Sequence, residues 1–149
     1  MLRAVSATDG VHVGSTREGI EKDDPMAKDE LALGGRGTEL FSGIAVNDLQ
    51  ASLKWYERLL GAPPSFLPND REAVWAIADH RWIYIIVEPA RAGRSVLTII
   101  CDDLEGLVED ISMRGITFDK EEIPAENVRK VMYYDPDGNE VGLGRVTAS

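Results

Sequence analysis

Two stretches of the chain repeat one pattern of apolar and polar positions. In each, an aspartate precedes apolar residues spaced three or four apart, and a glycine closes the run: Asp48 to Gly61, and Asp103 to Gly115. This spacing draws one apolar stripe along a helix, with the aspartate as N-cap and the glycine as left-handed C-terminal residue. The pattern predicts two amphipathic helices, and the 55-residue offset between the aspartates indicates one unit used twice.

Apolar runs typical of strands flank both predicted helices. One run precedes each helix, and others follow: residues 40–46, 73–78, 82–87, 95–101, 117–122, 128–134 and 140–146. Residues 63–67 supply one more short strand, which its prolines keep at a sheet edge. The chain therefore predicts an α+β fold of two βαβββ modules, at about residues 39–93 and 94–149.

Alternation along these strands separates two faces. One face is aliphatic and is predicted to pack under the helices: Ile44, Val46, Ile83, Ile85, Leu97, Ile99, Val141 and Leu143. The other mixes aromatic rings, glycines and polar groups, as a ligand cavity does: Phe41, Trp82, Tyr84, Thr98 and Gly142. Trp75 and Tyr134 join this candidate ligand site, although the sequence leaves the orientation of their strands open. The alternative is that the aromatic face fills core or a subunit interface.

The first 38 residues differ in composition from the rest. They are rich in glycine and charge, and their apolar residues follow no period, so we expect a disordered or loosely attached tail before a domain at residues 39–149. Met26 is an alternative start of translation.

Charge and cysteine content narrow the function classes. The net charge of −10 argues against nucleic acid and anionic membranes as partners. A single cysteine excludes an internal disulfide, and no run has the length or setting of a membrane span or signal peptide. We therefore expect a cytoplasmic protein.

Two segments resemble a known family. The sequence IAVNDLQASLKWY at residues 44–56 is similar to the opening signature of the vicinal oxygen chelate superfamily, which includes glyoxalase, bleomycin-resistance proteins and extradiol dioxygenases. The sequence DPDGN at residues 135–139 resembles its closing turn. The resemblance implies paired βαβββ modules whose sheets form a cup, with helices outside, the ligand within, and association into homodimers.

The resemblance also implies where a metal would be held. Enzymes of the superfamily take their ligands from strand positions that correspond here to Phe41, Tyr84, Val96 and Gly142. Phenylalanine, valine and glycine offer no side-chain donor to a divalent cation. We therefore expect no metal and no other cofactor.

These observations favour a metal-free protein that binds a planar or aromatic small molecule in the cup. Gly43, Gly142 and Gly144 would leave room for a flat ligand. One alternative is a lyase or isomerase using tyrosine and glutamate as acid and base, with Glu88 and Glu140 as the carboxylates on that side. Another is a degenerate domain that serves dimerisation or regulation.

Overall fold

The computed structural model describes residue 33 and residues 35–148. Most of the predicted N-terminal tail, residues 1–38, lies outside the described residues, and so does the alternative start at Met26.

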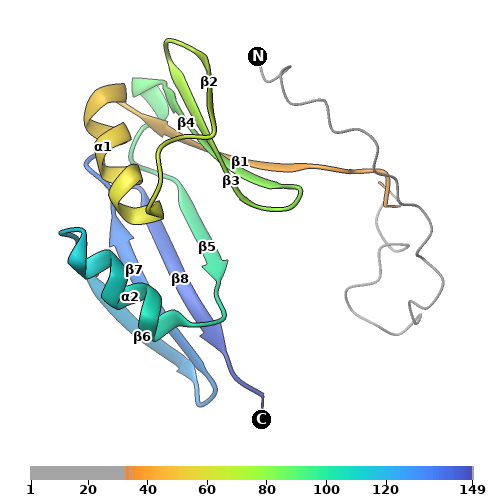
Figure 1. The fold of residues 1–149 in the computed structure, drawn as a ribbon, viewed down its shortest axis with the longest axis vertical. Helices are drawn as coiled ribbons and strands as arrows, with labels where there is room; N and C mark the ends of the chain where they lie inside the picture. The colour runs from red at the N-terminus through yellow and green to blue at the C-terminus, as the bar shows by residue number, and fades with distance from the viewer. Residues whose placement is uncertain (1–32, 34, 149) are drawn as a thin grey trace.

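The described chain forms two βαβββ modules, as predicted (Figure 1). The first contains β1 (Leu40–Val46), α1 (Leu49–Leu60), β2 (Phe66–Asn69), β3 (Glu72–Ala78) and β4 (Arg81–Val87). After a short 3-10 helix, η3 (Pro89–Arg91), the second contains β5 (Val96–Ile100), α2 (Leu104–Met113), β6 (Lys120–Ala125), β7 (Val128–Tyr134) and β8 (Glu140–Val146).

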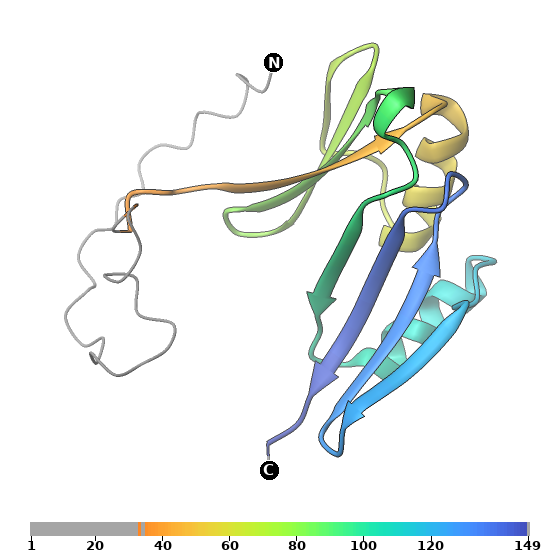
Figure 2. The ribbon, with the colours of Figure 1, turned by 180° about the vertical axis from the view of Figure 1, so that it is seen from behind.

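Each module has its own mixed four-stranded sheet, in the orders β1-β4-β3-β2 and β5-β8-β7-β6. The first and last strands of each module pair in parallel, and the other pairs are antiparallel. Both helices cover the same side of the molecule and leave the opposite strand faces open (Figures 1 and 2). Within the described residues, no helix combines the length and apolar character that crossing a membrane requires.

The predicted caps limit the helices. The Asp48 carboxylate accepts the N–H groups of Gln50 and Ala51, and Asp103 accepts that of Gly106. Gly61 ends α1 with a φ of 82°, a left-handed conformation that glycine adopts without strain. Helix α2 ends at Met113, two residues before Gly115.

Two edge strands begin later than predicted. Strand β2 starts at Phe66 rather than within the proline pair at residues 63 and 64, because proline has no N–H for strand pairing. Strand β6 starts at Lys120, whereas residues 117–119 form no strand. Ile116 and Phe118 pack against the core instead, so an apolar alternation typical of a strand belongs here to a loop.

One hydrophobic core joins the two modules. The aliphatic strand face lies in it as predicted: Ile44, Val46, Ile83, Ile85, Val141 and Leu143 are buried, and Leu97 and Ile99 pack against them. Tyr56 and Leu59 of α1 and Leu104 and Ile111 of α2 complete the same cluster. The modules therefore share their apolar surface.

Truncation of a side chain in this core is expected to destabilise the whole chain. Ile85 is 1% exposed, so Ile85→Ala should lower the free energy of unfolding by about 2–5 kcal/mol. Ile123→Ala, at a side chain 66% exposed, is the matched control and should change it by less than about 0.5 kcal/mol. Urea denaturation followed by tryptophan fluorescence measures both. Equal effects would contradict the assignment of faces.

Candidate functional site

Aromatic rings gather on the open face of the first sheet. The Phe41 and Trp82 rings stack with centroids 5.4 Å apart and planes 7° apart. Phe66 meets Trp82 edge-on at 6.1 Å, and Tyr84 meets Phe41 at 6.4 Å. Parallel pairing sets Phe41 beside Trp82 and Gly43 beside Tyr84, so these rings share one face. Three predicted site residues, Phe41, Trp82 and Tyr84, thus lie together, and we call them with Phe66 the aromatic platform.

A carboxylate fixes the orientation of the platform. The Trp82 indole N–H donates to Glu39 Oε1 at 2.8 Å, and His80 Nδ1 lies 2.7 Å from Glu39 Oε2. The indole hydrogen bond and His80 hold the pKa of Glu39 below its ordinary value, because both favour its charged form. Trp82 therefore presents its ring flat against Phe41.

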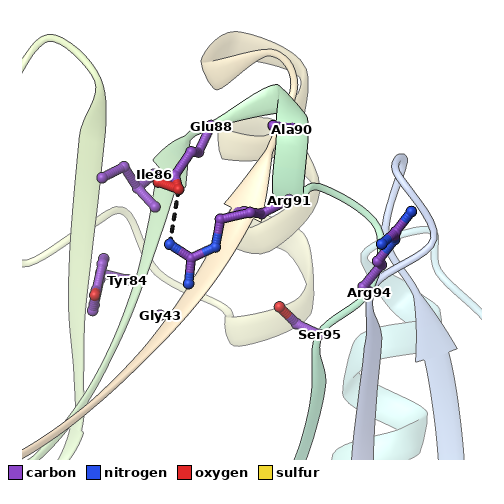
Figure 3. A pocket seen from close by; sticks show the side chains of 9 residues that line it. Gly43, Tyr84, Ile86, Glu88, Ala90, Arg91, Arg94 and Ser95 are labelled. Atoms are coloured by element: carbon purple, nitrogen blue, oxygen red, sulfur yellow. Dashed lines mark hydrogen bonds and ion pairs between the residues drawn. The ribbon is translucent and has the colours of Figure 1, made fainter.

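A cavity of about 530 Å³ opens beside the platform, where the first module meets the start of the second. Its walls come from β1, β4, η3 and the segment leading to β5: Gly43, Ala45, Tyr84, Ile86, Glu88, Ala90, Arg91, Arg94 and Ser95. Figure 3 shows Arg91 reaching across the cavity, paired with Glu88, with Tyr84 on one side and Arg94 and Ser95 on the other. Its volume is that of a small-molecule site.

The closing turn holds two of these walls in place. The Asn139 amide donates to Ala45 O at 2.9 Å, and its Oδ1 accepts the Ser95 N–H at 2.9 Å. Gly93 lies against the same turn with a φ of 90°, and a Cβ there would approach Asp137 O to 2.6 Å. The segment that carries Arg94 is therefore anchored at both ends.

A buried carboxylate organises that turn. Asp135 is 5% exposed and accepts the Tyr56 hydroxyl at 2.9 Å, the Asn139 amide at 2.9 Å, and the backbone N–H groups of Asp137 and Asn139. Burial and the adjacent negative charge raise the pKa of Tyr56 far above its usual range, so the phenol stays a donor. We call Asp135, Asn139 and Tyr56 the interlock, since they join α1 and β1 to the turn before β8.

The remaining predicted site residues lie elsewhere. Thr98, Tyr134 and Gly142 stand on the open face of the second sheet, where Thr98 pairs with Gly142 and the Tyr134 hydroxyl donates to Glu140 at 3.2 Å. Trp75 is 3% exposed, contacts Tyr56 and donates its indole N–H to Ala62 O. Trp75 therefore belongs to the core and does not face the cup, because odd positions of β3 point toward the helices.

The glycines do not leave the predicted open space. A Cβ at Gly43 would lie 2.5 Å from the Tyr84 ring, and one at Gly142 would lie 2.6 Å from the Lys130 side chain. Glycine at these positions accommodates a neighbouring side chain, which sequence alone does not reveal. Tyr84 thereby lies flat across β1.

The positions that would hold a metal in the resembled enzymes carry almost no side-chain donor atoms here. Phe41 and Tyr84 lie on the first sheet, whereas Val96 and Gly142 lie on the second. Only Tyr84 offers a side-chain oxygen, and nowhere in the described part of the chain do three or more histidine, cysteine, aspartate or glutamate residues gather. These residues do not fit a divalent cation.

Sequence reasoning missed three polar residues near the cavity. Arg91 and Arg94 line it from a segment that has no strand or helix periodicity to reveal its direction. The third is Glu72, a further carboxylate on the open side besides Glu88 and Glu140. It is the strand partner of Ile86, which lines the cavity, and its side chain is only 2% exposed. The sequence does not show which face of β3 carries Glu72, because this depends on how β3 is aligned with β4.

The chain is a paired-module α+β protein. Its two βαβββ modules have their helices on one side and a ligand-sized cavity on the strand face. The family model "Glyoxalase/Bleomycin resistance protein/Dioxygenase superfamily" matches residues 40–143. The chain belongs to this superfamily. Curated proteins gave no match.

Solved structures agree with this assignment. A glyoxalase/bleomycin resistance protein from Catenulispora acidiphila DSM 44928 is 45% identical, with a TM-score of 0.71 over 73% of this chain and 98% of that one. A bleomycin-binding protein complexed with bleomycin is 18% identical, with a TM-score of 0.61 over 73% and 98%. The antibiotic-binding protein TnmS3 from Streptomyces sp. CB03234 is 19% identical, with a TM-score of 0.58 over 73% and 95%. The last two share the fold.

Loss of the interlock hydroxyl is expected to be costly. Tyr56→Phe removes one donor from a buried carboxylate, and should lower the free energy of unfolding by about 1.5–3 kcal/mol. Tyr134→Phe removes a hydroxyl from an exposed pair with Glu140, and should cost less than about 0.5 kcal/mol. Denaturant unfolding of the two variants compares them directly. A Tyr56→Phe protein as stable as the Tyr134→Phe protein would refute the role given to the interlock.

Proposed function

We propose that this protein binds a planar or aromatic small molecule on the open face of its first sheet, without a bound metal. The observation that carries the proposal is the aromatic platform beside a cavity of about 530 Å³. Stacked or edge-on rings add about 0.5–1.5 kcal/mol to apolar burial, so Phe41, Trp82 and Tyr84 favour a flat ligand. Family membership and the antibiotic-binding structural neighbours support a binding role.

The absence of metal ligands supports the metal-free part of the proposal. Of the four positions concerned, three carry Phe41, Val96 and Gly142, whose side chains offer no donor atom. Ligand recognition therefore relies on ring stacking, shape and the polar groups of the cavity wall.

A second candidate function, acid–base catalysis, is favoured by one observation. Glu72 is 2% exposed, and its Oε2 has no hydrogen-bond partner in the described part of the chain, whereas Oε1 accepts the Asn69 amide at 2.7 Å. An unpartnered buried carboxylate oxygen is costly, and a catalytic role is one reason for a protein to keep one. Binding ranks higher because Glu72 does not line the cavity.

The binding proposal is tested with N-phenyl-1-naphthylamine, a neutral aromatic probe whose fluorescence rises in apolar surroundings. Tyr84→Ala should weaken its binding about three- to tenfold, because a stacking surface is lost. Tyr84→Phe is the matched control: it keeps the ring and should keep the affinity. Titrations before and after dialysis against EDTA should agree. Unchanged affinity in Tyr84→Ala, or loss of binding after EDTA treatment, would contradict the proposal.

We also propose that the protein forms a homodimer through its free sheet edges. Within the described residues, β1 pairs only with β4 and β5 only with β8, and apolar side chains stand exposed along both: Leu40 is 65% exposed, Val96 72% and Ile100 60%. Unpaired edges with exposed apolar residues favour association with another strand. A second copy that pairs its β5 with β1 would bring Thr98, Tyr134 and Gly142 toward the aromatic platform.

Light scattering measures this association. At micromolar concentration the wild-type chain should have twice its monomer mass, and Val96→Lys should shift the mass toward the monomer, because a charge would be buried at the edge. Thr117→Lys, at an exposed loop position away from both edges, should leave the mass unchanged. A monomeric wild type would refute the dimer.

A further inference from the structure

We infer that the ligand of the cavity carries a negative charge, held by Arg91 and Arg94. This inference rests on the proposed function and adds the chemical class of the ligand. Of the nine residues that line the cavity, the charged ones are these two arginines and Glu88. The wall thus carries a net charge of +1 in a chain whose net charge is −10.

The two arginines differ in what already binds them. Arg91 Nη1 lies 2.9 Å from Glu88 Oε1, and the side chains are 77% and 34% exposed, so water screens the pair and weakens it. No carboxylate in the described part of the chain lies within salt-bridge distance of Arg94. The guanidinium of Arg91 is therefore weakly paired, and that of Arg94 has no acidic partner among the described residues.

Three other arginines of the described chain make structural contacts. Arg129 pairs with Glu105 and Glu121, Arg145 pairs with Glu105, and Arg114 donates to carbonyl groups at the end of α1. Arg114 also lines a second cavity, of about 470 Å³, at the end of α1. Arg91 and Arg94 differ from it because their cavity is the one that Tyr84 of the aromatic platform lines.

The backbone places Arg91 across from Tyr84, the platform residue that lines the cavity, and Arg94 on the segment that leads to β5. Arg91 extends from η3 into the cavity, and Tyr84 forms the opposite wall (Figure 3). Arg94 follows Gly93, which is fixed on the closing turn, and precedes Ser95, whose N–H donates to Asn139. A flat ring on Tyr84 would direct an acidic substituent at the arginine side. Carboxylate, sulfonate and phosphate groups accept the parallel N–H groups of arginine, and charge-assisted bonds of this kind are the stronger ones.

Two matched probes test the inference on the full chain. The anion 1-anilinonaphthalene-8-sulfonate has the same ring skeleton as neutral N-phenyl-1-naphthylamine plus a sulfonate group. Arg91→Gln and Arg94→Gln should each weaken binding of the anion about tenfold and change binding of the neutral probe less than about twofold. Arg81→Gln is the control, since it removes the same charge from an exposed position outside the cavity.

Glu88→Gln gives an independent test of opposite sign. It frees Arg91 and removes the negative charge of the wall, so it should strengthen binding of the anion while the neutral probe is unaffected. If the arginine variants bind the anion as tightly as Arg81→Gln does, the inference is wrong even though binding of the neutral probe upholds the proposed function. If neither probe binds the wild-type chain, the proposed function fails and the inference with it.

Discussion

The buried carboxylate of Asp135 is the interaction on which the rest of the structure depends. A charge removed from water costs several kcal/mol unless hydrogen bonds replace its hydration. Asp135 receives a hydroxyl from α1, a side-chain amide from Asn139 and two backbone N–H groups of its own turn. These donors come from both modules, so the carboxylate is satisfied only when the modules are docked.

The interlock also explains why the cavity lies at the junction of the modules. The Asn139 side-chain amide donates to Ala45 O, and its side-chain oxygen accepts the Ser95 N–H. Ala45 and Ser95 both line the cavity. The same turn supports Gly93, which positions the following arginine. Structural and functional parts of the chain therefore meet in one turn, and the aromatic platform is held separately by Glu39 at the other end of the sheet.

Local signals in the sequence predicted most of the fold. Capping aspartates, the apolar stripe of each helix and the alternation of β1, β4, β5 and β8 describe short-range preferences that the structure keeps. The faces on which Trp75 and Glu72 lie were harder to predict. Every residue from Glu72 to Trp75 is buried, so β3 shows no alternation of apolar and polar residues there. The sequence could not predict where the cavity arginines lie, because their positions depend on how the segment before β5 packs on a turn 44 residues away in the sequence.

Native-state hydrogen exchange measures most directly whether the interlock makes the two modules one cooperative structure. Amides in the middle of β4, in the first sheet, and of β8, in the second, report the opening of each module. If the interlock joins the modules, the slowest amides of both strands open with the same free energy, and loss of the Tyr56 hydroxyl lowers both values equally. Opening of one module while the other stays protected would contradict this account.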